Sequence, residues 1–167
     1  KYEVTPELHE WLACYRDTSS AVSRSYANTL GISTPVANRS IAPTGTIGLI
    51  AGTTSGIEPI YSVAYKRRYL NNNNRWVHTY GVDFMAQTMI DLYKLDPKEI
   101  ETAADLAVDY ERRIKFQADV QDYVDMAISS TINLPSVPSD GYSDDFVDKF
   151  ATALASYSSR LRGFTCY

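Results

Sequence analysis

The last forty residues carry alternating strand and helix signals, and this alternation constrains the fold more than any other feature. The run STINLP, residues 130–135, holds β-branched and apolar side chains and ends at proline, which predicts a strand. Ser143 then stands as an N-cap before a helical apolar face, and residues 163–167 predict a second strand. Apolar positions on that face are Phe146, Val147, Phe150 and Leu154. Strand, helix and strand in this order imply a parallel pair with a right-handed crossover.

A second unit of the same kind is predicted earlier in the chain. Residues 36–42 form a short apolar segment typical of a strand, residues 45–51 a short helix with residues 52–56 as its exit, and residues 60–65 another strand. Two such units favour an α/β fold in which helices cover parallel strands.

Further helices are indicated by their terminal signals. Thr5 is an N-cap followed by a first-turn proline and acid, and residues 21–30 predict a second, polar helix that Gly31 ends. Residues 71–74 predict a polar turn, and the apolar spacing of residues 77–95 is helical.

Two more helices are expected in the second half of the chain. Asp96, Pro97 and Glu99 provide the N-cap, first-turn proline and capping-box acid of one. A long helix follows, with apolar and amide positions three and four residues apart. These positions are Ile114, Gln117, Val120, Val124 and Ile128.

Composition excludes several classes of function. The chain has 167 residues, the length of one ordinary domain, and 44% of them are hydrophobic, which is enough for a core. Its formal charge of -4 gives no basic field for nucleic acid or an anionic membrane, and no apolar run approaches the roughly 20 residues that cross a bilayer. Cys14 and Cys166 lie far apart without metal-ligand spacing, so we expect a cytoplasmic protein without a zinc site or a disulfide framework.

The small residues between the predicted strand at 36–42 and the following helix admit two interpretations. In α/β folds a ligand sits beyond the carboxyl end of a strand, where a helix start offers free amides, and Gly45 would let the backbone approach a phosphate. Thr44 and Thr46 would add hydroxyl donors, and Pro43 would fix the turn. Alternatively, Thr44 caps its own helix and Gly45 serves packing.

Three segments of the chain resemble the ribonucleotide reductase catalytic chain. The longest is IAPTGTIGLIAGTTSGIEPIYSVAYKRR, residues 41–68, in which PTGTI is followed by a helix of small and apolar residues and then by SGIEP. The segment QADVQDYVDMAISSTINLP, residues 117–135, and the final LRGFTCY occur in the same order and at the same distance as in that family.

This resemblance implies a partial α/β barrel, the later half-barrel of a barrel made from two halves with parallel strands and crossover helices. Residues 1–167 would be the C-terminal portion of the reductase barrel domain. The resemblance also implies reduction of ribonucleotides to 2′-deoxyribonucleotides by thiyl radical chemistry, with a thioredoxin-type reductant. In that family the loop corresponding to Pro43, Thr44, Gly45, Thr46 and Ile47 binds the substrate phosphates.

The sequence departs from the family pattern at the radical site. The family's Asn-x-Cys-x-Glu loop is absent, so no catalytic residue is assigned, and Cys14 and Cys166 are predicted to be small packed side chains. We therefore expect the chain to be inactive without the N-terminal reductase segment. A non-catalytic nucleotide-phosphate-binding or interaction module, or one half of a split reductase, remains the alternative.

The radical generator is a second implication of the resemblance. Diiron-dependent members carry adjacent tyrosines in the last strand, whereas Cys166 precedes Tyr167 here. This difference favours the adenosylcobalamin-dependent class, although no residue is assigned as a cobalamin contact.

Other polar residues have simpler predicted roles. Glu58 and Asp83 are expected to be solvated carboxylates, and the basic run from Lys66 to Arg68 a solvated strand end. His9 and His78 have no partner at metal-ligand spacing, and no metal site is predicted.

Overall fold

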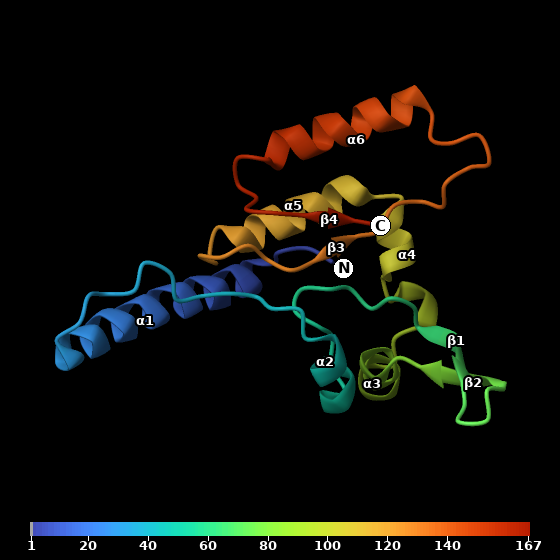
Figure 1. The fold of residues 1–167 in the computed structure, drawn as a ribbon, viewed down its shortest axis with the longest axis horizontal. Helices are drawn as coiled ribbons and strands as arrows, with labels where there is room; N and C mark the ends of the chain where they lie inside the picture. Colours follow the sequence, from blue (N-terminus) through green and yellow to red (C-terminus); the bar gives the residue numbers. More distant parts are fainter. Residues whose placement is uncertain (1) are drawn as a thin grey trace.

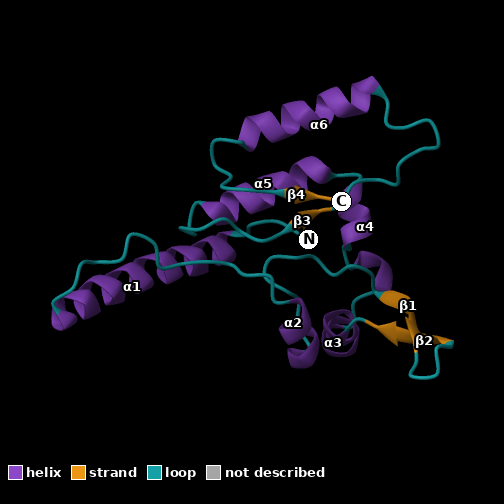
Figure 2. Ribbon diagram, in the orientation of Figure 1, coloured by secondary structure: helices purple, strands orange, loops and turns teal. Residues whose placement is uncertain are grey.

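The computed structural model describes residues 2–167, so Lys1, the first residue of the predicted domain, lies outside the described part. Helices and two small sheets alternate along the chain (Figures 1 and 2). In order, the elements are α1 (Pro6–Leu30), α2 (Gly45–Ala51), β1 (Ala64–Leu70), β2 (Trp76–Val82), α3 (Phe84–Tyr93), the 3-10 turn η1 (Pro97–Glu99), α4 (Ala103–Ala107), α5 (Tyr110–Gln121), β3 (Thr131–Ile132), α6 (Asp144–Tyr157) and β4 (Thr165–Cys166).

The C-terminal strand–helix–strand unit forms as predicted. β3 and β4 pair in parallel, with Thr131 opposite Thr165 and Ile132 opposite Cys166. The Ser143 side chain accepts a hydrogen bond from the Phe146 amide at the start of α6. α6 crosses between the two strands and packs on α5 around a buried apolar cluster. The centre of this cluster is Ile114, Ile132 and Ala153.

The strand predicted at residues 36–42 does not form, but the segment still lies beside the β3 region. The Arg39 and Ile41 carbonyls accept hydrogen bonds from the Met126 and Ser129 amides. The Asn38 and Arg39 amides instead donate to the carboxylate of Asp125. Because a side chain takes these two donors, a regular ladder cannot develop here.

The predicted parallel strand at residues 60–65 is wrong, because the chain forms an antiparallel hairpin. β1 and β2 pair from Ala64 opposite Val82 to Leu70 opposite Trp76, and the predicted turn at residues 71–74 connects them. Residues 77–82, predicted as helix, therefore lie in β2. The helical part, α3, begins only after Asp83, whose side chain accepts hydrogen bonds from the first free amides.

Two predicted helix boundaries also change. α1 runs without a break through residues 21–30, because no glycine or proline interrupts it before Gly31, which ends it in the left-handed conformation. α5 ends at Gln121, where the side-chain amide donates to the Val124 and Met126 carbonyls. Val124 and Ile128 lie beyond the helix yet remain buried.

The observed architecture is a mixed assembly of helices and two two-stranded sheets, and residues 2–167 contain no closed barrel. The capping box predicted for Asp96 and Glu99 is present, but it starts only the three-residue 3-10 turn η1 and not the predicted helix. Within the described residues, no helix combines the length and apolarity that a membrane span requires.

A buried arginine ties α1 to the centre of this assembly. The Arg39 guanidinium donates from Nε to the Tyr123 carbonyl and from Nη2 to Asp125 at 2.7 Å. Its Nη1 donates to three oxygens near the middle of α1. These belong to the Arg16 carbonyl and to the Ser19 and Ser20 hydroxyls.

We predict that Asp125→Asn lowers the free energy of unfolding at pH 7 by about 1–3 kcal/mol. The Asn38 amide, assisted by the amide and guanidinium of Arg39, holds the pKa of Asp125 below its usual value. A lowered folded-state pKa stabilises the fold above the unfolded pKa, and this contribution disappears as the pH falls through the folded pKa.

The difference in free energy of unfolding between Asp125→Asn and the unmodified protein, measured by urea unfolding, should therefore decrease as the pH falls from about 5 to about 2. Asp140→Asn, in an exposed loop, serves as the matched control and should change little at any pH. If the difference in free energy of unfolding stays constant across this pH range, the ionised carboxylate of Asp125 is not what stabilises the fold.

Candidate functional site

The loop before α2 leaves its first amides available for a ligand. Thr44 is the N-cap residue, but its side chain makes no capping hydrogen bond to the helix. Instead its Oγ1 accepts a hydrogen bond from the Gly56 amide at 3.3 Å, which ties the start of α2 to the loop that leaves it. Because first-turn amides have no partner within a helix, those of α2 depend on solvent or on a ligand.

This loop borders a cavity of about 440 Å³. Three segments and the start of α4 form its walls: the loop before α2, the loop after it, and the chain around β3. The lining residues are Pro43, Thr44, Gly45, Ser55, Glu58, Pro59, Tyr61, Ala103, Ser129, Thr131 and Asn133. Hydroxyl, amide and carboxylate groups therefore share one concave surface.

The structure brings together part of the predicted phosphate loop. Pro43, Thr44 and Gly45 line the cavity, whereas Thr46 and Ile47 lie on exposed helix surface outside its lining. A Cβ atom built on Gly45 would meet no atom within 4 Å, so the space in front of this residue is open.

Glu58 is held by hydrogen bonds, so the prediction of a solvated carboxylate is wrong. Its Oε1 accepts from the Thr131 amide at 2.7 Å, and its Oε2 pairs with Arg113 Nη2 at 3.1 Å. The Glu58 side chain is 31% exposed and that of Arg113 only 2%. The carboxylate thus stands at the boundary between the cavity and the protein interior.

The guanidinium behind Glu58 is enclosed on its other sides. Arg113 Nη2 also donates to the Ser130 hydroxyl, and the Tyr2 ring lies 5.1 Å from its central carbon. The Tyr2 hydroxyl donates to the Ile57 carbonyl, and burial raises the pKa of this phenol while the charge of Arg113 opposes the rise. Arg113 Nε and Nη1 have no hydrogen-bond partner among the described residues.

Sequence reasoning assigned no role to most residues of this cavity. Glu58 and Pro59 belong to the SGIEP motif, and Thr131 and Asn133 to the STINLP run, so the signal that could have found them was already present. The sequence could not predict that these two motifs lie close together in space, because they are about seventy positions apart in the chain.

Other residues considered from the sequence serve local structure. Asp83 caps α3 and is not a free carboxylate, which corrects its prediction. Cys14 and Cys166 are free thiols at exposed positions, so the prediction that they are packed is wrong. His9 pairs with the Tyr123 hydroxyl.

The basic run of β1 lies on the exposed hairpin, as expected. Lys66 and Arg68 sit over the Tyr80 and Trp76 rings of β2, and His78 shares this strand. Cation–aromatic contacts account for these positions without a phosphate ligand.

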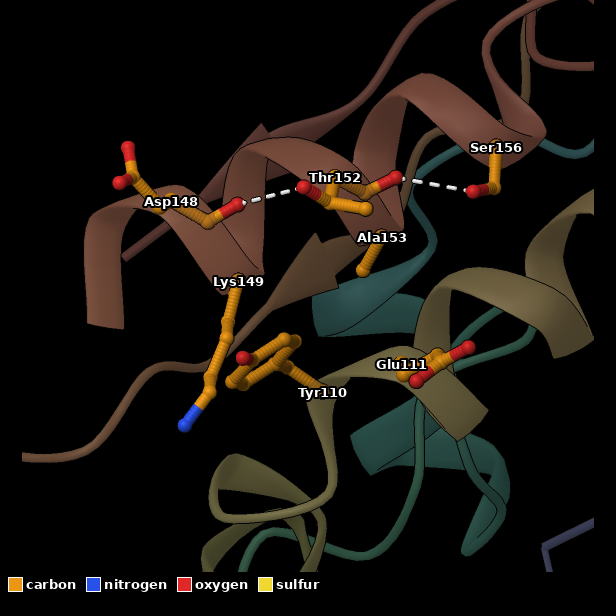
Figure 3. A pocket seen from close by; sticks show the side chains of 7 residues that line it. All are labelled: Tyr110, Glu111, Asp148, Lys149, Thr152, Ala153 and Ser156. Carbon is orange, nitrogen blue, oxygen red and sulfur yellow. Dashed lines mark hydrogen bonds between the residues drawn. The ribbon is translucent and has the colours of Figure 1, made fainter. Parts of the chain in front are cut away.

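A second cavity, of about 390 Å³, lies between α5 and α6 (Figure 3). Two of its hydroxyl groups are already used within α6, because Thr152 donates to the Asp148 carbonyl and Ser156 to the Thr152 carbonyl. Lys149 extends past the Tyr110 ring and pairs with Asp145. Because the Thr152 and Ser156 hydroxyls and the Lys149 ammonium are paired within α6, these groups offer less to a ligand than the amides at Gly45 do.

The described residues hold no metal centre and do not by themselves fit a corrinoid. Residues 2–167 contain no group of three or more potential metal-ligating side chains. The Gly45 cavity, at about 440 Å³, and a shallow one of about 580 Å³ on the hairpin have the size of pockets for small ligands. Adenosylcobalamin is much larger than such ligands, so neither cavity could enclose it.

Comparison with protein families assigns the chain. The model described as "Ribonucleotide reductase, barrel domain" matches residues 36–157, which include the loop before α2, Glu58 and Arg113. The chain belongs to the ribonucleotide reductase barrel-domain family. In this reductase segment, α1 lies before the matched region and β4 after it.

Curated relatives of this reductase segment are vitamin B12-dependent ribonucleoside-diphosphate reductases. That of Mycobacterium tuberculosis is 32% identical over 147 residues, which cover 77% of this chain and 20% of the relative. That of Thermoplasma acidophilum is 33% identical over 114 residues, 58% of this chain and 15% of the relative. The chain therefore spans about a fifth of the length of the relatives that it matches.

A solved structure supports the fold. The crystal structure of a B12-dependent, class II, ribonucleotide reductase superposes with a TM-score of 0.70 at 16% identity, covering 98% of this chain and 24% of the other. The partial barrel predicted from the sequence is confirmed at the level of fold.

The two glycines of α2 give a testable contrast in stability. A Cβ atom on Gly48 would lie 2.9 Å from Ser55 Oγ and 3.2 Å from the Thr53 carbonyl, whereas the space at Gly45 is open. We expect Gly48→Ala to cost about 1–3 kcal/mol of unfolding free energy. Gly45→Ala, the matched control, should stay within about 0.5 kcal/mol of the unmodified protein. Equal effects in thermal or urea unfolding would show that Gly48 is not closely packed.

Proposed function

We propose that this chain is the part of a ribonucleotide reductase that binds the substrate phosphates. The phosphate-binding residues would be Pro43, Thr44, Gly45, Thr46 and Ile47, as the family resemblance implies. The whole enzyme would reduce ribonucleotides to 2′-deoxyribonucleotides by thiyl radical chemistry, with this segment binding and orienting the substrate.

The observation that carries this proposal is the uncapped loop at the edge of a cavity. Thr44 gives its side-chain oxygen to Gly56 and not to the helix, so it leaves the first amides of α2 without a side-chain acceptor. Open space in front of Gly45 allows an anion to approach the backbone closely. Amides, the Thr44 hydroxyl and the cavity volume together suit a phosphate group better than an apolar ligand.

Residues of this chain would position the substrate without forming or breaking bonds. The described residues have no Asn-x-Cys-x-Glu loop, so the thiyl radical and the reducing cysteines would come from the remaining N-terminal reductase segment. A thioredoxin-type reductant would serve the whole enzyme.

Adenosylcobalamin is proposed as the radical source because the curated relatives are named as vitamin B12-dependent. When bound, it would supply the radical that generates the thiyl species. Residues outside this chain must provide most of its contacts, since the cavities at Gly45 and on the hairpin are too small for it.

Substitution of Gly45 by a larger residue tests the phosphate site. Gly45→Val should weaken binding of CDP and ADP by at least about tenfold, because the side chain fills the open space in front of the loop. Isothermal titration calorimetry on the full chain measures the change. Gly163→Ala, whose added Cβ would make an ordinary 3.7 Å contact with Ala127, is the control and should bind as the unmodified protein does. Unchanged affinity in Gly45→Val would remove this loop from the site.

Reconstitution separates the reductase from a binding module. We expect no turnover of CDP or ADP by the chain alone, and turnover when the N-terminal reductase segment, adenosylcobalamin and a dithiol are added. Formation of the deoxynucleotide is followed by chromatography. Nucleotide binding without turnover in the complete mixture would favour a non-catalytic nucleotide-binding module.

A further inference from the structure

The Gly45 cavity has an unusual charge for a phosphate site. Glu58 is the charged residue among the lining residues that the structure describes, and it is negative. Among residues 2–167, the cavity lining includes no lysine or arginine. Arg113 lies behind Glu58, and its side chain is 2% exposed. A ligand that is only an anion would gain amide contacts at Gly45 but would be repelled by the carboxylate.

The carboxylate retains free acceptor capacity. An ionised carboxylate can accept about four hydrogen bonds, and Glu58 accepts one from the Thr131 amide and one from Arg113. Both of these donors lie on the protein side, since the Thr131 amide belongs to β3 and Arg113 to the interior of α5. The Glu58 side chain is 31% exposed and lines the cavity, so its remaining acceptor capacity is open to a ligand there.

Hydrogen bonds to both of its oxygens fix the orientation of the Glu58 carboxylate. Arg113 Nη2 bonds to Glu58 and to the Ser130 hydroxyl, and the Tyr2 ring closes over the guanidinium. Since Arg113 Nε and Nη1 have no other partner among the described residues, this arginine has Glu58 as its one carboxylate partner in that region. The charge-assisted hydrogen bond from this buried guanidinium, with the one from the Thr131 amide, holds the carboxylate in place.

From these observations we infer that Glu58 is a specificity residue of the cavity, with Arg113 as its positioning residue. Glu58 accepts a hydrogen bond from a sugar hydroxyl of a ligand whose phosphate lies at Gly45. The cavity thus selects a phosphorylated sugar, as in a nucleotide, over a bare phosphate. This inference rests on the proposed phosphate site.

Ligand analogues test the inference without altering the protein. Calorimetry on the full chain compares CDP, 2′,3′-dideoxycytidine diphosphate and inorganic pyrophosphate. We expect CDP to bind about tenfold more tightly than its dideoxy analogue, because a hydrogen bond to a charged acceptor is lost in the analogue. Pyrophosphate should bind more weakly than CDP, since it meets the carboxylate without a donor.

Variants of the protein then test whether Glu58 is the residue that distinguishes CDP from its dideoxy analogue. In Glu58→Gln the ratio between CDP and the dideoxy analogue should fall to within about twofold, while pyrophosphate affinity stays equal or rises as the negative charge disappears. Glu101→Gln is the matched control, because Glu101 is also a half-buried glutamate paired with an arginine but does not line the cavity. Glu101→Gln should keep the affinity ratio between CDP and the dideoxy analogue that the unmodified protein shows.

Arg113→Lys tests the positioning role. It should reduce the hydroxyl discrimination while leaving pyrophosphate affinity unchanged, and Arg112→Lys on the neighbouring position should do neither. A loss of all binding in Arg113→Lys with a lowered melting temperature would indicate a purely structural role and overturn the positioning assignment.

The outcomes separate this inference from the proposed function. If CDP and pyrophosphate both bind the unmodified chain but CDP and its dideoxy analogue bind alike, the role of Glu58 is wrong and the phosphate site stands. If neither CDP nor pyrophosphate binds, the phosphate site fails and the role of Glu58 fails with it.

Discussion

The ion pair between Arg113 and Glu58 joins the parts of the chain that form the cavity. Arg113 belongs to α5, Glu58 to the loop after α2, and the Thr131 amide and Ser130 hydroxyl to the chain around β3. Removing the Glu58 carboxylate would leave the buried Arg113 guanidinium without a charge partner, which destabilises a fold. Placement of the cavity wall therefore depends on this contact as well as on the apolar clusters around it.

The apolar core supports this arrangement in separate pieces. One cluster centres on Ile114, Ile132 and Ala153 between α5, β3 and α6, and another on Val120, Val124 and Ile128. A third forms beneath the hairpin and α3. Polar links span the gaps between clusters, as Arg39 does between α1 and the end of α5. Buried arginines thus hold together both the cavity wall, through Arg113, and the contact of α1 with the rest of the fold, through Arg39.

Local signals in the sequence predicted local structure well. The caps at Thr5, Asp96 and Ser143, the short helix Gly45–Ala51 and the parallel pairing of β3 with β4 all form. The predictions of secondary structure were wrong where a residue far away in the sequence determines the conformation. Residues 77–82 have helical apolar spacing but pair with β1, and residues 36–42 lose their ladder donors to Asp125. A carboxylate 86 positions from Arg39 cannot be anticipated from local propensity.

The sequence alone determined the family and the loop around Gly45, because a long motif of small residues in fixed order needs no tertiary information to be recognised. The tertiary structure alone decided that Glu58 faces that loop across a cavity and is held from behind by Arg113. This division has a physical reason, because helix caps and turns depend on residues that are neighbours in the sequence. The environment of a half-buried carboxylate depends on which distant segments surround it.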